Sequence, residues 1–192
     1  NTGQQYIMFG DDDSNAGWIS YNHSDNNLNF RVNGSERMRI TSNGSIYNGL
    51  VSNTHFGLNA LSSVTTADES TAFGNNALGS QQTGRNTAVG FHTLQDLTTG
   101  NYNTAVGKSA LGASTTGCSN TAVGTTALQS STTGVKNTAV GQNAAGKMTT
   151  ASGNTTMGYY AALYNTAGNN TAIGDQALKG ACDVSTGGNN VA

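Results

Sequence analysis

The chain has 192 residues and a mass of 19.6 kDa, a length that suits one ordinary domain, but its composition is unusual. Gly, Thr, Asn and Ser together make up 96 residues, and charged residues only 9%, against about 25% in typical globular proteins. The formal net charge of −2 argues against nucleic acid and acidic membrane surfaces as partners, and no apolar run approaches the roughly 20 residues of a membrane-spanning helix.

The N-terminal part, residues 1–50, predicts a small antiparallel β module. Short strands are expected at residues 5–9, 18–21, 28–32, 37–41 and 45–47. The dipeptides Asn33-Gly34 and Asn43-Gly44 favour tight hairpin turns, and the Asp/Asn-rich runs at 11–15 and 25–27 are typical of turns. The chain begins at Asn1 without a basic or apolar leader, as expected for a processed product or a fragment.

From Asn53 onward, residues 51–192 predict a second part built of repeats. Units about 17 residues apart open with a motif seen best as Asn-Thr-Ala-Val-Gly, at 86–90 and 103–107, and eight units are complete before a ninth begins at Asn190. The fourth position is always apolar, and the fifth is always glycine. These repeat glycines are Gly57, Gly74, Gly90, Gly107, Gly124, Gly141, Gly158 and Gly174.

Each unit predicts one coil of a solenoid. The opening residues favour a short strand, the glycine a bend or a close backbone approach, and the Ala-Leu pair that follows one helical turn. Thr and the fourth-position residue share one strand face, and Asn, Ala and Gly share the other. We expect the large apolar residues and Leu to fill the coil interior. His55 and Thr156 replace Ala, which predicts looser or end-like levels there.

The expected fold class is therefore all-β with short helical turns, an antiparallel module followed by a parallel β-solenoid-like stack. Each coil has little apolar surface to offset the entropy of ordering about 17 residues, so we expect a homotrimer whose chains share a core. Cys118 and Cys182 lie four coils apart, roughly 19 Å along the stack, and a disulfide needs Cα atoms within about 7 Å. They should not pair within a chain.

Two segments resemble viral fibre proteins. The run FGDDDSNAGWISYNHSD at 9–25, with NGSERMRITSNG at 33–44, resembles a module common in phage and large-virus tail-fibre proteins. The motif GNNTAIG at 168–174 resembles repeats that often precede an endosialidase-type intramolecular chaperone in such fibres, and more loosely the head repeats of trimeric autotransporter adhesins. The resemblance implies a trimeric fibre protein. It departs from the fibre module at 46–50, where IYNGL replaces a Val-Gly-Ile-Gly-like strand.

Catalytic and metal-binding signatures are weak. The acidic run 11–13 lacks the frame of a calcium loop, which favours a solvated turn, and His23, His55 and His92 have no metal-ligand spacing. No nucleophile elbow, phosphate loop or recurrent carboxylate pair is present. We therefore expect no enzyme, cofactor or metal. Aromatic residues outside the strands could instead stack on sugars or pack between chains, namely Phe91, Tyr102, Tyr159, Tyr160 and Tyr164.

The leading functional hypothesis is a structural segment of a trimeric phage tail fibre, in the virion, that serves host-surface attachment. Its partners would be other fibre or tail proteins and a host glycan or protein, without nucleic acid or membrane insertion. The alternatives are a bacterial trimeric adhesin head at the cell surface, a polysaccharide-depolymerising tailspike, and an ice-binding solenoid. The last rests on the second-position threonine ladder, which is only one residue wide.

Overall fold

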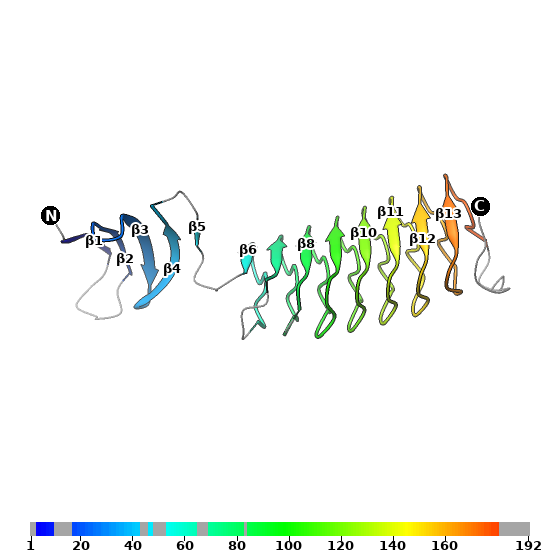
Figure 1. Cartoon of the computed structure of the whole chain (residues 1–192), viewed down its shortest axis with the longest axis horizontal. Helices are drawn as coiled ribbons and strands as arrows, with labels where there is room; N and C mark the ends of the chain where they lie inside the picture. The colour runs from blue at the N-terminus through cyan, green and yellow to red at the C-terminus, as the bar shows by residue number, and fades with distance from the viewer. Residues whose placement is uncertain are drawn as a thin grey trace. The chain divides into compact units, whose positions relative to one another are not determined.

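The computed structural model describes residues 3–9, 17–42, 46–47, 53–64, 69–82 and 84–180. The chain divides into two compact units, Asn1–Thr54 and His55–Ala192, so the division falls four residues after the boundary expected from sequence. Every regular element in the described ranges is a β-strand (Figure 1). The all-β class and the order of the two parts are as predicted.

The first unit is an antiparallel sheet in which strands adjacent in sequence are adjacent in space. Its order is β1-β2-β3-β4-β5. The strands are β1 (Gln4–Phe9), β2 (Gly17–Asn22), β3 (Asn27–Val32), β4 (Ser35–Ile40) and the short β5 (Ile46–Tyr47). Asn33 and Gly34 both have positive φ, 55° and 72°, as a two-residue hairpin turn between β3 and β4 requires. The turn predicted at 43–44 lies outside the described residues.

The second unit is a parallel stack of three-residue strands, one from each coil (Figure 1). They are β6 (Thr54–Phe56), β7 (Thr71–Phe73), β8 (Thr87–Val89), β9 (Thr104–Val106), β10 (Thr121–Val123), β11 (Thr138–Val140), β12 (Thr155–Met157) and β13 (Thr171–Ile173). Equivalent positions pair directly: Val123 of β10 lies between Val106 of β9 and Val140 of β11. The predicted one-above-the-other stacking of the repeats is confirmed.

The predicted interior of the coils is wrong in one respect. The strand alanines, such as Ala122, are fully buried, whereas the fourth-position residues point outward. Val123 is 36% exposed and Phe56 77%. The two sets of residues on opposite strand faces are as predicted, but the inward face is the one that carries Asn and Ala. Of the large residues, the corner leucines such as Leu111 and Leu128 do lie inside, fully buried.

A buried column of asparagines accompanies the alanines inside the stack. In the central coils each side-chain oxygen accepts from the backbone N–H and the side-chain amide of the asparagine in the next coil, and each amide also donates to a backbone carbonyl. The column consists of Asn86, Asn103, Asn120, Asn137, Asn154 and Asn170. Burying so many amides is tolerable because every coil supplies partners for the next.

The corner after each strand is made of tight turns, and the predicted helical turn is wrong. In the coil of β10, Ala127 N–H donates to the Gly124 carbonyl at 3.2 Å, and two residues later Gln129 N–H donates to Thr126 at 3.3 Å. Thr126 and Leu128 have φ of 58° and 51°, in the left-handed region, so successive hydrogen bonds form without a helical run. Leu128 N–H then donates to Ala144 of the next coil at 3.0 Å.

The repeat glycines from Gly57 to Gly158 are required by both conformation and space, and Gly174 in the last described coil by conformation alone. Gly107 has φ of 129°, and a Cβ there would lie 2.6 Å from the carbonyl oxygen of Gly124 in the next coil. No other residue type combines that φ with so close a backbone approach. The expected bend and close approach at this position are confirmed.

The two positions that lack alanine differ from each other. His55 lies in the first described coil and is half-buried. Thr156 is fully buried, and its hydroxyl donates to the Thr138 carbonyl at 3.3 Å, so its coil is neither loose nor terminal. The expectation of an end-like level is therefore wrong for Thr156. Cys118 is a free thiol that accepts from the Asn101 N–H at 3.4 Å, and Cys182 lies outside the described residues.

Candidate functional site

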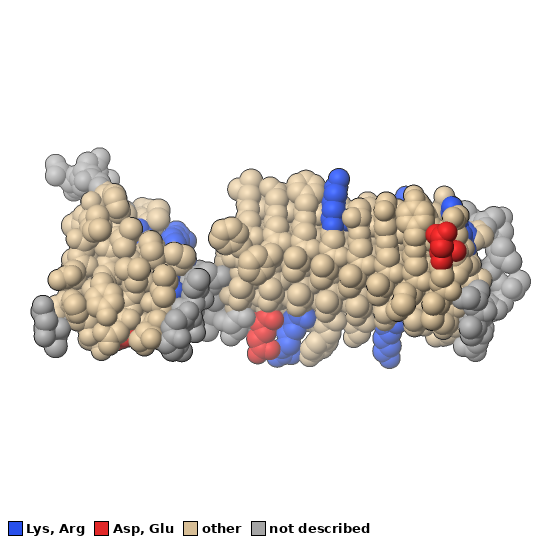
Figure 2. Space-filling model, turned by 90° about the horizontal axis from the view of Figure 1, so that it is seen from above, with Lys and Arg blue, Asp and Glu red and all other residues tan. Residues whose placement is uncertain are grey.

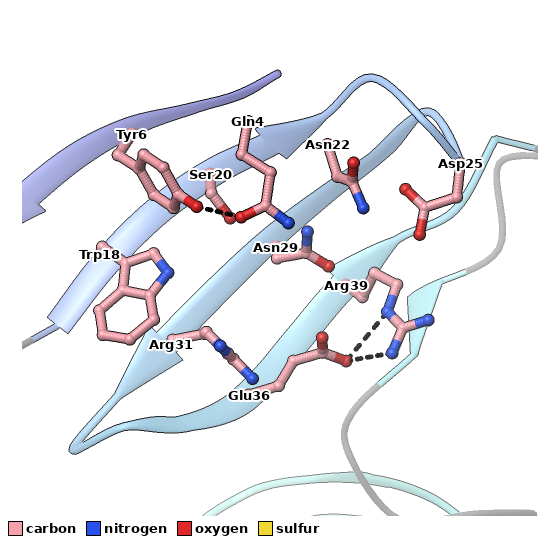
Figure 3. A pocket seen from close by; sticks show the side chains of 10 residues that line it. All are labelled: Gln4, Tyr6, Trp18, Ser20, Asn22, Asp25, Asn29, Arg31, Glu36 and Arg39. Atoms are coloured by element: carbon pink, nitrogen blue, oxygen red, sulfur yellow. Dashed lines mark hydrogen bonds and ion pairs between the residues drawn. The ribbon is translucent and has the colours of Figure 1, made fainter. Parts of the chain in front are cut away.

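The strongest candidate site is a hollow of about 210 Å³ on the polar face of the first sheet. Alternate residues of neighbouring strands bring their side chains to this face. One cross-strand row contains Trp18, Arg31 and Glu36, and the next contains Ser20, Asn29 and Arg39. Gln4, Tyr6, Asn22 and Asp25 complete the lining. Figure 3 shows these side chains gathered over β1 to β4.

The charges in the hollow are arranged in two different ways. Glu36 accepts from Nε and Nη2 of Arg39 at 2.9 and 2.7 Å, so this pair is neutralised within the sheet. The Arg31 guanidinium instead lies over the Trp18 ring, 5.2 Å from its centroid, and its buried Nε has no hydrogen-bond partner among the described residues. The cation therefore packs against the indole, and within the described part of the chain it forms no ion pair with a carboxylate.

Several polar groups in the hollow are available to a ligand. Within the described part of the chain, Asp25 and Asn29 have no side-chain hydrogen bond, although both line the hollow. The Tyr6 hydroxyl donates to the side-chain oxygen of Gln4. Figure 3 draws both side chains beside Ser20. The arrangement combines a half-buried indole with convergent donors and acceptors, as small-molecule sites do.

The opposite face of the same sheet is apolar. Ile7, Ile19, Phe30 and Met38 form one continuous cross-strand row there. Ile7 is 60% exposed, and no second layer covers the row within the described residues of this unit. A sheet normally buries such a face against another element. This surface, the row of four residues, is called the sheet-side apolar face below.

The coil stack has its own uncovered apolar surface, the outward fourth-position file. It runs along all eight strands and consists of Phe56, Phe73, Val89, Val106, Val123, Val140, Met157 and Ile173. It contains no charged residue, and the rings of Phe56 and Phe73 stack with centroids 6.4 Å apart. In Figure 2 the visible surface of the stack is almost uniformly tan, with charged side chains projecting mainly at its edges.

Four of the five aromatic residues singled out from the sequence do not form one site. Phe91 and Tyr159 occupy the same place in coils four apart, so about 19 Å separates them along the stack. Phe91 stacks on His92 at 3.8 Å, and Tyr159 packs edge-on against Tyr160 at 4.3 Å. A hydrogen bond with Tyr160 raises the pKa of Tyr159. Each ring is thus paired with a neighbour on an exposed surface.

Tyr102 belongs to a different surface of the stack. Its hydroxyl accepts from Nη1 of Arg85 at 3.0 Å, and Arg85 also donates to Glu69 at 2.7 Å. The hydrogen bonds to Glu69 and Tyr102 raise the pKa of Arg85 above its ordinary value. This exposed chain links three consecutive coils. It connects neighbouring repeats, and the Tyr102 hydroxyl is already bonded to Arg85.

Metal-binding clusters and membrane-spanning helices are absent from the described ranges. No cluster of three or more His, Cys, Asp or Glu side chains that could hold a metal occurs in the described part of the chain. Nor does that part contain a helix of the length and hydrophobicity needed to cross a membrane. The acidic run at 11–13 lies outside the described residues. The sequence does not indicate the hollow, because most of its lining residues come from four strands. Only the folded sheet defines the register that brings them together.

Together, fold and surfaces define a parallel β-solenoid repeat protein with an antiparallel β module at one end of the sequence. Comparison with known proteins adds no relative: no family model, no curated protein and no solved structure matches the chain.

Proposed function

We propose that this chain is a structural segment of a trimeric viral tail fibre that serves attachment to a host surface. The observation that carries the proposal is that both units leave an apolar surface uncovered. The sheet-side apolar face crosses β1 to β4, and the fourth-position file crosses β6 to β13. Large continuous apolar surfaces of this kind are typical of protein–protein interfaces.

Identical copies of the chain are the simplest occupants of both surfaces. The fourth-position file is uncharged and repeats with the period of the coils, so an identical file presents matching residues at matching heights. In a closed ring of three, each of the two surfaces can be buried against its own copies in the other chains. The polar hollow, on the other face of its sheet, stays open to solvent.

The coil stack suits a load-bearing shaft. Every central coil is joined to the next by strand pairing, by the asparagine column and by corner hydrogen bonds. A stack with such repeated connections resists bending and local opening. With the resemblance of residues 9–25, 33–44 and 168–174 to fibre modules, this favours a spacer or head that carries attachment over a catalytic role.

The test begins with the oligomeric state. Sedimentation equilibrium of the purified chain is expected to give three times the 19.6-kDa chain mass, without dissociation on dilution. The double variant Val106→Asp/Val123→Asp places charges on the file in adjacent coils and should dissociate the trimer. The matched control is Thr116→Asp/Thr133→Asp, exposed positions also one coil apart and outside the file. A folded monomer would overturn the proposal.

Location tests the viral part of the proposal. Antibodies against the chain should decorate tail fibres of intact virions in negative-stain images. Labelling of bacterial cell surfaces instead would favour the adhesin alternative, and shortening of capsular polysaccharide on incubation with the protein would favour a depolymerase.

A further inference from the structure

We propose that the hollow on the polar face of the first sheet binds a pyranose unit of a glycan. The inference rests on the proposed function only for its biological role, since attachment would give such a site its use. The proposed ligand would contact residues of the first unit, and not the aromatic side chains of the coil stack that the sequence suggests as sugar contacts.

The indole of Trp18 supplies the stacking surface. Trp18 is half-buried, and the Arg31 guanidinium lies over its ring, 5.2 Å from the centroid. The C–H-rich face of a pyranose ring packs well on a flat aromatic ring. An indole already held by a neighbouring cation loses little further freedom when a ligand stacks on it.

Polar groups of neighbouring strands lie on the same sheet face as the indole. Asn29 pairs in register with Ser20 on β2 and with Arg39 on β4. It lies two residues from Arg31 along β3. Neighbouring strands are about 4.8 Å apart, and alternate residues about 7 Å, so a single ring can reach groups from two or three strands. A hydroxyl both donates and accepts, and can therefore pair with the Arg31 guanidinium in the cross-strand row of Trp18 or with the Asn29 amide in the next row.

Size and charge together disfavour other ligand classes. A hollow of about 210 Å³ is smaller than the roughly 300–1,000 Å³ of sites for larger organic molecules. Its formal charges cancel, with Asp25 and Glu36 against Arg31 and Arg39. A phosphate or a carboxylate would meet both acidic side chains, whereas an uncharged polyol gains hydrogen bonds from acids and bases alike.

The experiment uses the only tryptophan of the chain. Because the sequence contains one Trp, its emission reports the hollow directly. The intact, assembled chain is titrated with methyl glucoside, methyl galactoside, N-acetylglucosamine and glucuronic acid. We expect a saturable change of emission with at least one neutral sugar, a Kd on the order of 1 mM for one ring, and little dependence on salt.

Two variants place the ligand. Asn29→Ala removes a lining group in the middle of the sheet face, and Arg31→Gln removes the guanidinium beside Trp18. Each is expected to weaken binding about tenfold with an unchanged circular dichroism spectrum. The matched control, Gln5→Ala, lies on β1 with its side chain among the lining of the opposite face, and should bind as the unchanged chain does.

The outcomes separate this site from the proposed function. Absence of binding by all four sugars overturns the site, as does unchanged binding by both folded lining variants. Binding of glucuronic acid alone, abolished by salt, also overturns it in favour of an ion-pairing site. The oligomeric state is measured on the same samples: a trimer without sugar binding refutes only the site, and a monomer that binds sugar refutes only the fibre assembly.

Discussion

The side-chain oxygen of Asn103 accepts two hydrogen bonds from Asn120 in the next coil, one from the backbone N–H at 3.0 Å and one from the side-chain amide at 3.1 Å. The Asn120 amide then donates to the Gly134 carbonyl at 2.8 Å, and its oxygen serves Asn137 in the same way. The buried column is thus a continuous hydrogen-bonded ladder, and each member is needed by both neighbours.

Replacing one member should therefore be costly. Asn120→Ala leaves the Asn137 N–H and the Gly134 carbonyl buried without these partners, and is expected to lower the free energy of unfolding by about 2–4 kcal/mol. Urea unfolding followed by circular dichroism measures this. The control Asn101→Ala removes an exposed bond to Thr99 in the same coil and should cost under about 1 kcal/mol. Equal effects of the two variants would contradict the ladder.

The repeat glycines make a second prediction. Gly74→Ala forces an alanine to φ of 137° with its Cβ 2.6 Å from the Gly90 carbonyl carbon, and should destabilise the stack by about 2–5 kcal/mol. Gly79 lies in the same coil, has no positive φ and would place its Cβ no closer than 3.4 Å to other atoms. Thermal unfolding should show Gly79→Ala close to the unchanged chain, and a comparable loss there would contradict the argument.

The inward position of the strand alanines can be tested at Ala122. Ala122→Val adds two methyl groups to a filled interior and is expected to lower the free energy of unfolding by about 1–3 kcal/mol. Ala122→Thr has nearly the same shape but can repeat the bond that Thr156 makes to the carbonyl of the preceding coil, and should cost less. Thr116→Val, which exchanges a hydroxyl for a methyl group at an exposed position, should be neutral. Tolerance of Ala122→Val would mean that this strand face is not the interior.

A pH effect is expected at His55. Burial lowers the pKa of His55 below its ordinary value of 6.5, so the folded chain holds the neutral imidazole while the unfolded chain binds the proton more readily. The contribution of this histidine is complete above pH 6.5 and falls as the pH decreases through 6.5 toward the lowered folded value. Hydrogen exchange at the Gly74 amide, which bonds to Phe56, should quicken on acidification beyond the intrinsic pH effect. His55→Gln should remove this extra dependence.

Much of the fold followed from local patterns. Alternation and turn chemistry predicted the first four antiparallel strands to within about two residues, and Asn33-Gly34 needed only its own two residues to specify a hairpin. The fixed period predicted parallel stacking in register, and the invariant glycine predicted close approach. These features depend on short-range geometry that the sequence states directly.

The candidate site could not be predicted in the same way. Trp18, Asn29 and Glu36 lie on three strands, and nothing in their spacing along the chain shows that they share one face. The hollow depends on the pairing register, including the irregularity between Phe30 and Arg31 that brings Glu36 opposite Arg31. The sequence indicates which aromatic residues lie outside the strands of the repeats. It does not show which of them line a common surface.

The sequence by itself determined the repeat, its period and the two sets of residues that face opposite ways from each strand. Only the tertiary structure decided which set faces inward. A single coil would expose its asparagine amide on one side or bury it without a partner, and hydrophobicity alone would then turn Val106 inward. Stacking removes that penalty, because each amide finds its partners in the adjoining coils, and the narrow interior accepts Ala105 and Asn103 while the valine is left on the outside.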